Sequence, residues 1–194
     1  MIVVKLGGSL YTSSYLSEWV NKLVSVHNET IIIVPGGGPF ADQVRKASHD
    51  WSVNDEVAHD MAVMAMQQYA LVLTSLNESL MPLDSIDLLG NETQAVNQTY
   101  VWLPYTDSIS KCRYPKNWQV TSDSISLWLA KNVLANKLCL IKSANISDLS
   151  DDEIMSSDIV DEYFSIAKKD FNGSIVFYHA SESNQFINDI SDHG

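Results

Sequence analysis

The stretch Ile31-Ile32-Ile33-Val34-Pro35-Gly36-Gly37-Gly38 determines the predicted fold, because it joins a continuous β-branched run to three glycines. Such a run is typical of a central strand in a parallel sheet, which is buried on both faces. Residues 39–47 then have the spacing of a helix. The same pattern occurs earlier, where a strand at 2–6 ends at Gly7-Gly8 and a helix is predicted over 15–26. This repeated unit of strand, glycine turn and helix predicts an α/β fold.

The rest of the chain continues this alternation. Residues 54–76 have apolar side chains around much of the helix circumference, so we expect this helix to be buried against the sheet or a partner subunit. No repeat or linker marks a boundary, so we predict one domain over residues 1–194, a three-layer αβα sandwich with a mostly parallel central sheet. The other predicted elements are strands at 99–103, 137–142 and 174–178, helices at 123–132, 151–155 and 163–168, irregular segments at 80–91 and 104–117, and a polar tail after 178.

The charge balance excludes two classes of function. The chain has 194 residues with 24 Asp and Glu against 12 Lys and Arg, a formal net charge of −12. A general nucleic-acid binder or a polybasic membrane-surface protein needs clustered cations, so neither is expected. Cationic residues outnumber acidic ones only in residues 1–49 and 100–142, and these cations can provide local positive charge for a small anionic ligand. Because the sequence has no signal-peptide layout and no apolar run of about 18 residues, we expect a cytoplasmic protein that does not enter a membrane.

Glycines follow both of the first two strands. Lys5 stands near the end of the first strand, and Gly7-Gly8-Ser9 behind it lets backbone NH groups approach a ligand closely, which suits phosphate oxygens. A simple tight turn explains the presence of Gly7 and Gly8 equally well. Three consecutive glycines at 36–38 are costly in conformational entropy, which favours a functional role for them. The Walker pattern and the dinucleotide pattern G-x-G-x-x-G are both absent from the sequence.

Two more chemical groups stand at the ends of predicted elements. Thr121-Ser122-Asp123-Ser124 opens a helix with Thr121 or Ser122 as its N-cap, and Lys142 ends a strand. This order of a strand-end lysine, two glycine loops, an Asp at a helix start and a second strand-end lysine resembles the amino acid kinase family, which includes acetylglutamate, uridylate and isopentenyl phosphate kinases. The segments that resemble its short branch, associated with methanofuran biosynthesis, are 5–9, 36–42, 58–62, 65–69, 101–105 and 118–124.

The resemblance implies an ATP-dependent phosphotransferase that uses Mg²⁺ and transfers the γ-phosphoryl group to a small acceptor. For the short branch, the implied acceptor is a phosphate monoester, (aminomethyl)furanylmethyl phosphate. Phosphoryl transfer depends on positioning and on charge stabilisation. The resemblance therefore implies that Lys5 and Lys142 stabilise the transferring group and that Asp123 orients both ammonium groups. It implies phosphate or nucleotide contacts for Gly7, Gly8, Ser9, Ser122 and Ser143, acceptor contacts for Gly36, Gly37, Gly38 and His59, and no particular metal ligand.

Several residues near the implied acceptor pocket also fit ordinary structural roles. His59 is equally well described as a plain core or exposed histidine. Arg45 is more simply a solvated helix arginine than a ligand for the acceptor phosphate. Met61, Met64 and Met66 suit a core or a dimer surface better than a ligand pocket, and we expect a homo-oligomer, a dimer or higher.

The C-terminal half departs from the larger members of the family. Those members follow the second lysine with a D-G nucleotide loop, whereas Lys142 is followed by Ser143-Ala144-Asn145. The resemblance divides the chain into an acceptor-binding half at about 1–117 and a shortened nucleotide-binding half at about 118–194, where 158–164 looks like the branch's own version of this region. Two other functions remain open, a non-catalytic nucleotide-binding or sensor protein and an amino acid or carbamate kinase that forms an acyl phosphate.

Overall fold

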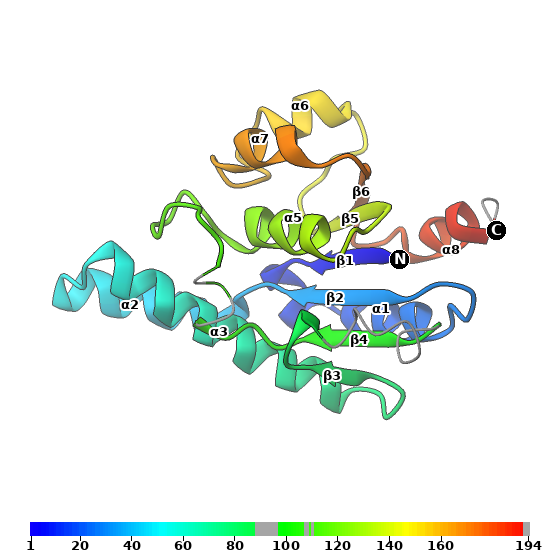
Figure 1. Ribbon diagram of the computed structural model, residues 1–194, viewed down its shortest axis with the longest axis horizontal. Helices are drawn as coiled ribbons and strands as arrows, with labels where there is room; N and C mark the ends of the chain where they lie inside the picture. The colour runs from blue at the N-terminus through cyan, green and yellow to red at the C-terminus, as the bar shows by residue number, and fades with distance from the viewer. Residues whose placement is uncertain (88–96, 107–108, 110, 192–194) are drawn as a thin grey trace.

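The computed structural model describes residues 1–87, 97–106, 109 and 111–191. Its strands are β1 (Ile2–Leu6), β2 (Ile31–Pro35), β3 (Met81–Leu83), β4 (Thr99–Trp102), β5 (Lys137–Lys142) and β6 (Ser174–His179). Within the described residues these strands form one six-stranded sheet of order β3-β4-β2-β1-β5-β6, and every pairing is parallel. Figure 1 shows the strands stacked in this order, with β3 at the bottom. The predicted α/β fold with a mostly parallel sheet is confirmed.

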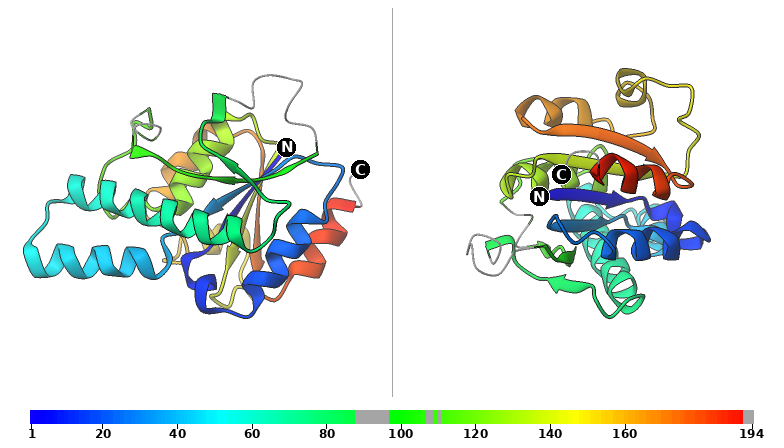
Figure 2. Two further views of the ribbon diagram at one scale, coloured as in Figure 1. Left: turned by 90° about the horizontal axis from the view of Figure 1, so that it is seen from below. Right: turned by 90° about the vertical axis from the view of Figure 1, so that its right-hand side faces the viewer.

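Helices cover both faces of this sheet. They are η1 (Gly8–Thr12), α1 (Tyr15–Val24), α2 (Gly38–Trp51), α3 (Asp55–Ser75), α5 (Ser122–Asn132), α6 (Asp151–Met155), α7 (Phe164–Ala167), η3 (Lys168–Asp170) and α8 (Ser183–Ser191). Figure 2 shows α1 and α8 side by side on one face and α5 on the other. Among the described helices, none is long and apolar enough to cross a membrane.

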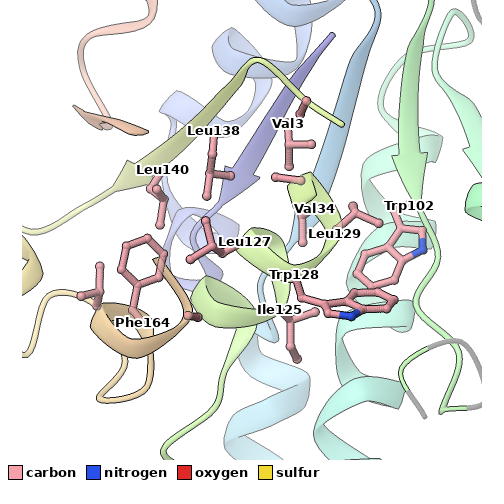
Figure 3. Close-up of a cluster of buried hydrophobic side chains, with 14 of the residues drawn as sticks. Val3, Val34, Trp102, Ile125, Leu127, Trp128, Leu129, Leu138, Leu140 and Phe164 are labelled. Atoms are coloured by element: carbon pink, nitrogen blue, oxygen red, sulfur yellow. The ribbon is translucent and has the colours of Figure 1, made fainter. Parts of the chain in front are cut away.

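The strands are hydrophobic on both sides because each face of the sheet packs against helices. Successive side chains of a strand point to opposite faces. In β1, Val3 packs in a cluster with α5, whereas Val4 packs in a second cluster with α1, and both side chains are fully buried. Figure 3 shows the first cluster, in which Leu127 of α5 faces side chains from the sheet. This double burial explains why the strands read as continuous apolar runs.

The strand order places the carboxyl ends of β2, β1 and β5 next to one another. In the register of the sheet, Lys5 of β1 lies opposite Val34 of β2 and Leu140 of β5. The loops that follow β1 and β2 therefore meet the end of β5 at one edge of the sheet. Open parallel sheets bind ligands at this edge.

α2 and α3 form a helical hairpin that extends beyond the sheet (Figures 1 and 2). α2 ends at Trp51, and Ser52 turns the chain in the left-handed conformation, with φ at 51°. One side of α3 packs against the sheet and α2. On another side, Val57, Met64 and Leu71 are 47%, 54% and 56% exposed. The expected burial of this helix around much of its circumference is therefore not met within one chain.

The structure corrects the predicted elements at three places. Residues 81–83 form the edge strand β3 where an irregular segment was expected, and its short length and Pro82 hide the strand pattern. The expected polar tail contains α8, which is anchored by Phe186 and Ile190, two buried side chains four residues apart. The helix predicted at 39–47 continues to Trp51. Positions 88–91, 107–108, 110 and 192–194 of the predicted segments lie outside the described residues.

Candidate active site

Three charged side chains meet at the carboxyl edge of the sheet. Lys5 lies in β1, Lys142 is the last residue of β5, and Asp123 lies in the first turn of α5. Asp123 Oδ1 lies 2.8 Å from both Lys5 Nζ and Lys142 Nζ, and Asp123 Oδ2 accepts a second hydrogen bond from Lys142 Nζ at 2.7 Å. The three side chains are only 5%, 10% and 6% exposed, in the order Lys5, Lys142 and Asp123. The structure thus brings together the three residues predicted to act in catalysis.

Burial and the neighbouring charges both shift the pKa values of Asp123 and Lys142. Burial raises the pKa of the Asp123 carboxyl, but the ammonium groups of Lys5 and Lys142 outweigh it and hold this pKa below its ordinary value. Burial and the charge of Lys5 lower the pKa of Lys142 to about 8, although Asp123 acts in the other direction. Two lysines therefore share one ionised carboxylate, and their positive charge is held close together.

The two glycine loops contact each other through their backbones. A Cβ atom at Gly36 would lie 2.4 Å from Gly8 N, and one at Gly8 would lie 2.7 Å from Gly38 N. A Cβ atom at Gly7 would lie 2.9 Å from Ile141 O. Gly38 also has φ at 54°, a conformation that favours glycine. The loops after β1 and β2 can lie this close only because these positions have no side chain.

These loops also direct backbone amides toward one region. Gly8 and Ser9 begin η1 and Gly38 begins α2, so their NH groups precede the hydrogen bonds made within each helix. The amides of Gly7 and Gly36 are used differently, since they donate to backbone carbonyls at 3.2 and 2.8 Å. Amides at helix N-termini bind anions. Gly8, Ser9 and Gly38 are therefore better placed than Gly7 and Gly36 to contact phosphate oxygens.

A cavity of about 400 Å³ opens beside Lys5. Its wall includes the apolar side chains of Ala62, Val63 and Met66 from α3. Ser143 lies outside this wall but shares a hydrogen bond with Ser9, with the two Oγ atoms 2.6 Å apart. The predicted site residues that line the cavity are Lys5, Gly8, Ser9, Gly37, Gly38, His59 and Ser122, and those that do not are Gly7, Gly36, Asp123, Lys142 and Ser143.

Charged and aromatic groups also line the cavity. Arg45 forms an ion pair with Asp42 at 2.7 Å, and its guanidinium lies 5.0 Å from the centre of the Trp118 ring. Arg45 is thus held by two neighbours, although half of its side chain remains in solvent. His59 is buried, and this burial lowers its pKa, which is opposed by a hydrogen bond with the backbone of Asn117. His59 is therefore a neutral side chain that is both buried and in contact with the cavity.

Sequence reasoning assigned no role to Asp161, which the structure places beside this group. Its Oδ2 accepts hydrogen bonds from Thr121 N at 2.8 Å and from Ser124 N at 3.0 Å, so it is bound to the first turn of α5. Burial and then the charge of Asp123 raise the pKa of Asp161. Asp161 lies 37 residues beyond Ser124, so no local pattern predicts the contact. In the described part of the chain, no group of three or more His, Cys, Asp or Glu side chains is placed to hold a metal ion.

Comparisons with known proteins agree with this architecture. The model of the amino acid kinase family matches residues 1–148. (5-(Aminomethyl)furan-3-yl)methyl phosphate kinase from Methanocaldococcus jannaschii is 28% identical over 185 residues, which cover 88% of this chain and 84% of that protein. The crystal structure of uridylate kinase from Archaeoglobus fulgidus aligns with a TM-score of 0.71 at 14% identity, over 96% of this chain and 95% of that one. An isopentenyl phosphate kinase structure aligns with a TM-score of 0.62 at 12% identity, over 96% of both chains.

The two solved structures share too little sequence with this chain to show more than a common fold. The family model is more informative, since it covers the glycine loops, Asp123 and Lys142 in one continuous match. The proteins found are kinases, which confirms the prediction of a phosphotransferase. The chain belongs to the amino acid kinase family.

Proposed function

We propose that this protein is an ATP-dependent kinase that transfers the γ-phosphoryl group to a phosphate monoester, (aminomethyl)furanylmethyl phosphate, as a step of methanofuran biosynthesis. The observation that carries the proposal is the placement of Lys5, Asp123 and Lys142 beside a cavity bordered by two glycine loops. The named relative acts on a phosphate of this class. The proposal extends that acceptor to this chain.

The charged group, which consists of Lys5, Asp123 and Lys142, suits a reaction that transfers a negatively charged phosphoryl group. In phosphoryl transfer, catalysis consists mainly of positioning and electrostatic stabilisation. Lys5 and Lys142 would stabilise the transferring group, and Asp123 would hold the two ammonium groups in place. The amides of Gly8 and Ser9 would bind the transferring phosphoryl group, and the region of Gly37 and Gly38 would bind the acceptor phosphate.

The cavity has the chemical character that this acceptor requires. Its volume of about 400 Å³ lies within the range of small-molecule sites. The apolar side chains of Ala62, Val63 and Met66 suit a furan ring, and Arg45 provides a cation for a phosphate. Asp42 provides a carboxylate for the aminomethyl group, which is cationic at neutral pH. His59, with its lowered pKa, would contact the acceptor as a neutral hydrogen-bonding group.

The nucleotide would approach from the side of Lys142. Ser143 directly follows Lys142, and Ser122 lines the cavity beside Lys5 next to Asp123. We propose that both serines contact the donor phosphates. Mg²⁺ usually binds to substrate phosphates and to one or two carboxylates. The Asp123 oxygens are both engaged by lysines, so the ion would be held mainly by ATP.

Phosphorus NMR tests the proposed reaction directly. Purified protein is incubated with ATP, Mg²⁺ and a panel of family acceptors, and conversion of (aminomethyl)furanylmethyl phosphate to a diphosphate is expected. ATP binding by calorimetry without turnover of any acceptor would instead identify a non-catalytic nucleotide-binding protein. An acyl phosphate trapped by hydroxylamine would identify an amino acid or carbamate kinase. Either result overturns the proposed acceptor.

Substitution of the two lysines tests their roles. Lys5→Ala and Lys142→Ala should each lower kcat about 100-fold or more, because each removes a charge that stabilises the transition state. Lys131→Ala is the matched control, since Lys131 is an exposed lysine on α5 that pairs with Asp170 at 3.2 Å. Near-normal kcat values in the first two variants would remove both lysines from the mechanism.

We also propose a homo-oligomer in which α3 pairs with α3 of a second copy. The exposed side chains Val57, Met64 and Leu71 are spaced by seven residues, so two antiparallel helices would place Met64 against Met64 and Val57 against Leu71. Light scattering after size exclusion should give a dimer or a higher oligomer. Met64→Glu should convert it to a smaller species, and a monomeric wild-type protein would refute the pairing.

A further inference from the structure

The segment 159–163, between α6 and α7, is attached to the charged group at several points. The carbonyl oxygen of Ile159 accepts a hydrogen bond from Lys142 Nζ at 2.6 Å. The backbone NH of Tyr163 donates to the carbonyl of Gln119 at 3.2 Å, just before α5. Asp161 lies between these two contacts. One short segment therefore contacts both the second lysine and the start of the helix that carries Asp123.

Asp161 performs the function of an N-cap for α5. Thr121 is the N-cap by position, but its side chain makes no capping bond within the helix. Asp161 Oδ2 instead accepts from Thr121 N at 2.8 Å, Thr121 Oγ1 at 2.9 Å and Ser124 N at 3.0 Å, and Asp161 Oδ1 accepts from Ser124 Oγ. A carboxylate here satisfies amides that the first turn leaves unpaired and matches the helix dipole. Asp123 lies in the turn that Asp161 fixes.

Lys142 is held by the same segment. An ammonium group has three N–H donors. The three oxygens in hydrogen-bonding contact with Lys142 Nζ are Asp123 Oδ1, Asp123 Oδ2 and the carbonyl oxygen of Ile159. The orientation of Lys142 thus depends on Asp123 and on the backbone two residues before Asp161.

We propose that Asp161 is a positioning residue for phosphoryl transfer, which holds the first turn of α5 and thereby sets the contact of Asp123 with Lys5 and Lys142. The proposal rests on the kinase activity proposed above. Asp161 does not line the cavity beside Lys5; together with Asp123 it lines a second cavity, of about 620 Å³. Its contact with the lysines is made through Asp123 and through its own charge. The family resemblance left the segment 158–164 without a role, and these contacts provide one.

The charge of Asp161 makes the proposal measurable at Lys142. The groups around Lys142 are Lys5 from β1, Asp123 from α5 and Asp161, while His179 lies in register on β6 with its side chain bonded to Ser181. Asp123 and Asp161 raise the pKa of Lys142, against the larger lowering by burial and by Lys5. Removing the charge of Asp161 should therefore lower this pKa below about 8.

Two substitutions separate the cap from the charge. Asp161→Asn keeps an oxygen that can accept from Thr121 and Ser124 but removes the charge, whereas Asp161→Ala removes both. Ser150→Ala is the matched control, because Ser150 caps α6 by accepting from Glu153 N and has no contact with the charged group. Thermal unfolding measured by circular dichroism verifies that each variant is folded.

The first readout needs no substrate. The side-chain ¹³Cε signal of Lys142, assigned by its loss in Lys142→Arg, is titrated with pH in each protein. The apparent pKa should fall by at least about 0.5 in Asp161→Asn and Asp161→Ala and stay unchanged in Ser150→Ala. An unchanged Lys142 titration in both Asp161 variants would overturn the proposal, whether or not the protein proves to be a kinase.

The second readout is kinetic. In Asp161→Ala, kcat should fall by at least about tenfold while KM for the acceptor changes less than about threefold, because a positioning residue acts on the transition state. Asp161→Asn should retain more activity than Asp161→Ala. As pH rises, Asp161→Asn should lose this activity at a lower pH than the wild type does. A kcat for Asp161→Ala within twofold of Ser150→Ala refutes the positioning role. If the wild type has no turnover but the NMR shift occurs, the coupling of Asp161 to Lys142 stands and only the kinase activity is refuted.

Discussion

Asp123→Asn is the substitution that most directly tests the charged group. Asn has nearly the same shape as Asp but removes the negative charge that both lysines share. Asp123 is almost fully buried, so water cannot replace the lost charge. Breaking a buried ion pair by removing one partner usually costs about 3–5 kcal/mol, because the remaining charge is left uncompensated. Asp123→Asn leaves two buried ammonium groups, those of Lys5 and Lys142, without their shared negative partner.

The size of the effect follows from the geometry. Lys5 Nζ and Lys142 Nζ each lie 2.8 Å from Asp123 Oδ1, so they are at most about 5.6 Å apart. At an effective dielectric constant of about 20, their repulsion is roughly 3 kcal/mol. That energy lowers a lysine pKa by about 2. The pKa of about 8 for Lys142 already includes this repulsion, and the attraction of Asp123, over about half that distance, opposes it. Asp123→Asn removes that attraction, so the pKa of Lys142 should fall by at least about 2 and the side chain should be mostly neutral at pH 7.5.

Steady-state kinetics across pH measures this consequence. With ADP release as the assay, Asp123→Asn should lower kcat/KM about 100-fold or more at pH 7.5, the loss that follows removal of one electrostatic group from a transition state. The ratio of mutant to wild-type kcat/KM should then rise by roughly tenfold or more from pH 8 to pH 6, because Lys142 regains its proton. Asp170→Asn, which removes an exposed partner of Lys131, is the control. A ratio that stays flat with pH would refute the shared-charge reasoning.

Three other measurements test separate parts of the site. Gly36→Ala should destabilise the protein by about 1–3 kcal/mol in urea unfolding and lower kcat/KM, because its Cβ atom would lie 2.4 Å from Gly8 N; unchanged stability would refute the close packing of the loops. In the wild type, kcat/KM should fall as pH rises through about 8, where Lys142 loses its proton, and a flat alkaline profile would remove that lysine's charge from the mechanism. Calorimetry should show at least about tenfold weaker ATP binding in EDTA than with Mg²⁺, because bare ATP brings more negative charge than the site offsets; equal affinities would contradict this balance.

The parts of the site that sequence predicts are those set by parallel strands. β1 and β2 read as strands because each is buried on both faces, and their glycines mark where the strands end. The family resemblance implies that Lys5 and Lys142 act together, and parallel strands direct their carboxyl ends to one edge, so these two residues can meet although they lie far apart in the chain. Asp123 lies close to both lysines because it stands in the first turn of α5, and this helix begins near the carboxyl edge of the sheet. In the structure, Lys5 Nζ and Lys142 Nζ each lie 2.8 Å from Asp123 Oδ1.

The parts that sequence misses depend on contacts between distant segments. The capping of α5 connects Asp161 to Ser124 and Thr121, which lie 37 and 40 positions earlier in the chain, and no periodicity encodes these contacts. For the glycines at 36–38, the entropy cost alone favours a ligand-binding role. The structure gives Gly36 a packing role instead, because its neighbour is the backbone of Gly8. α8 escapes prediction for a similar reason, since its buried side consists of few residues that become apolar contacts only beside α1.

The charge of the site itself explains how an acidic chain can bind phosphates. Lys5 and Lys142 are balanced nearby by Asp123 and Asp161, and Arg45 is paired with Asp42, so the side chains around the cavity are close to neutral. Attraction for phosphate must then come largely from backbone amides at the starts of η1 and α2, whose partial charges are fixed by the fold. The lysines contribute by direct contact and not by an excess of cations. A net charge of −12 is therefore compatible with a phosphate site, because the binding is local and the opposing acids lie elsewhere or are already paired.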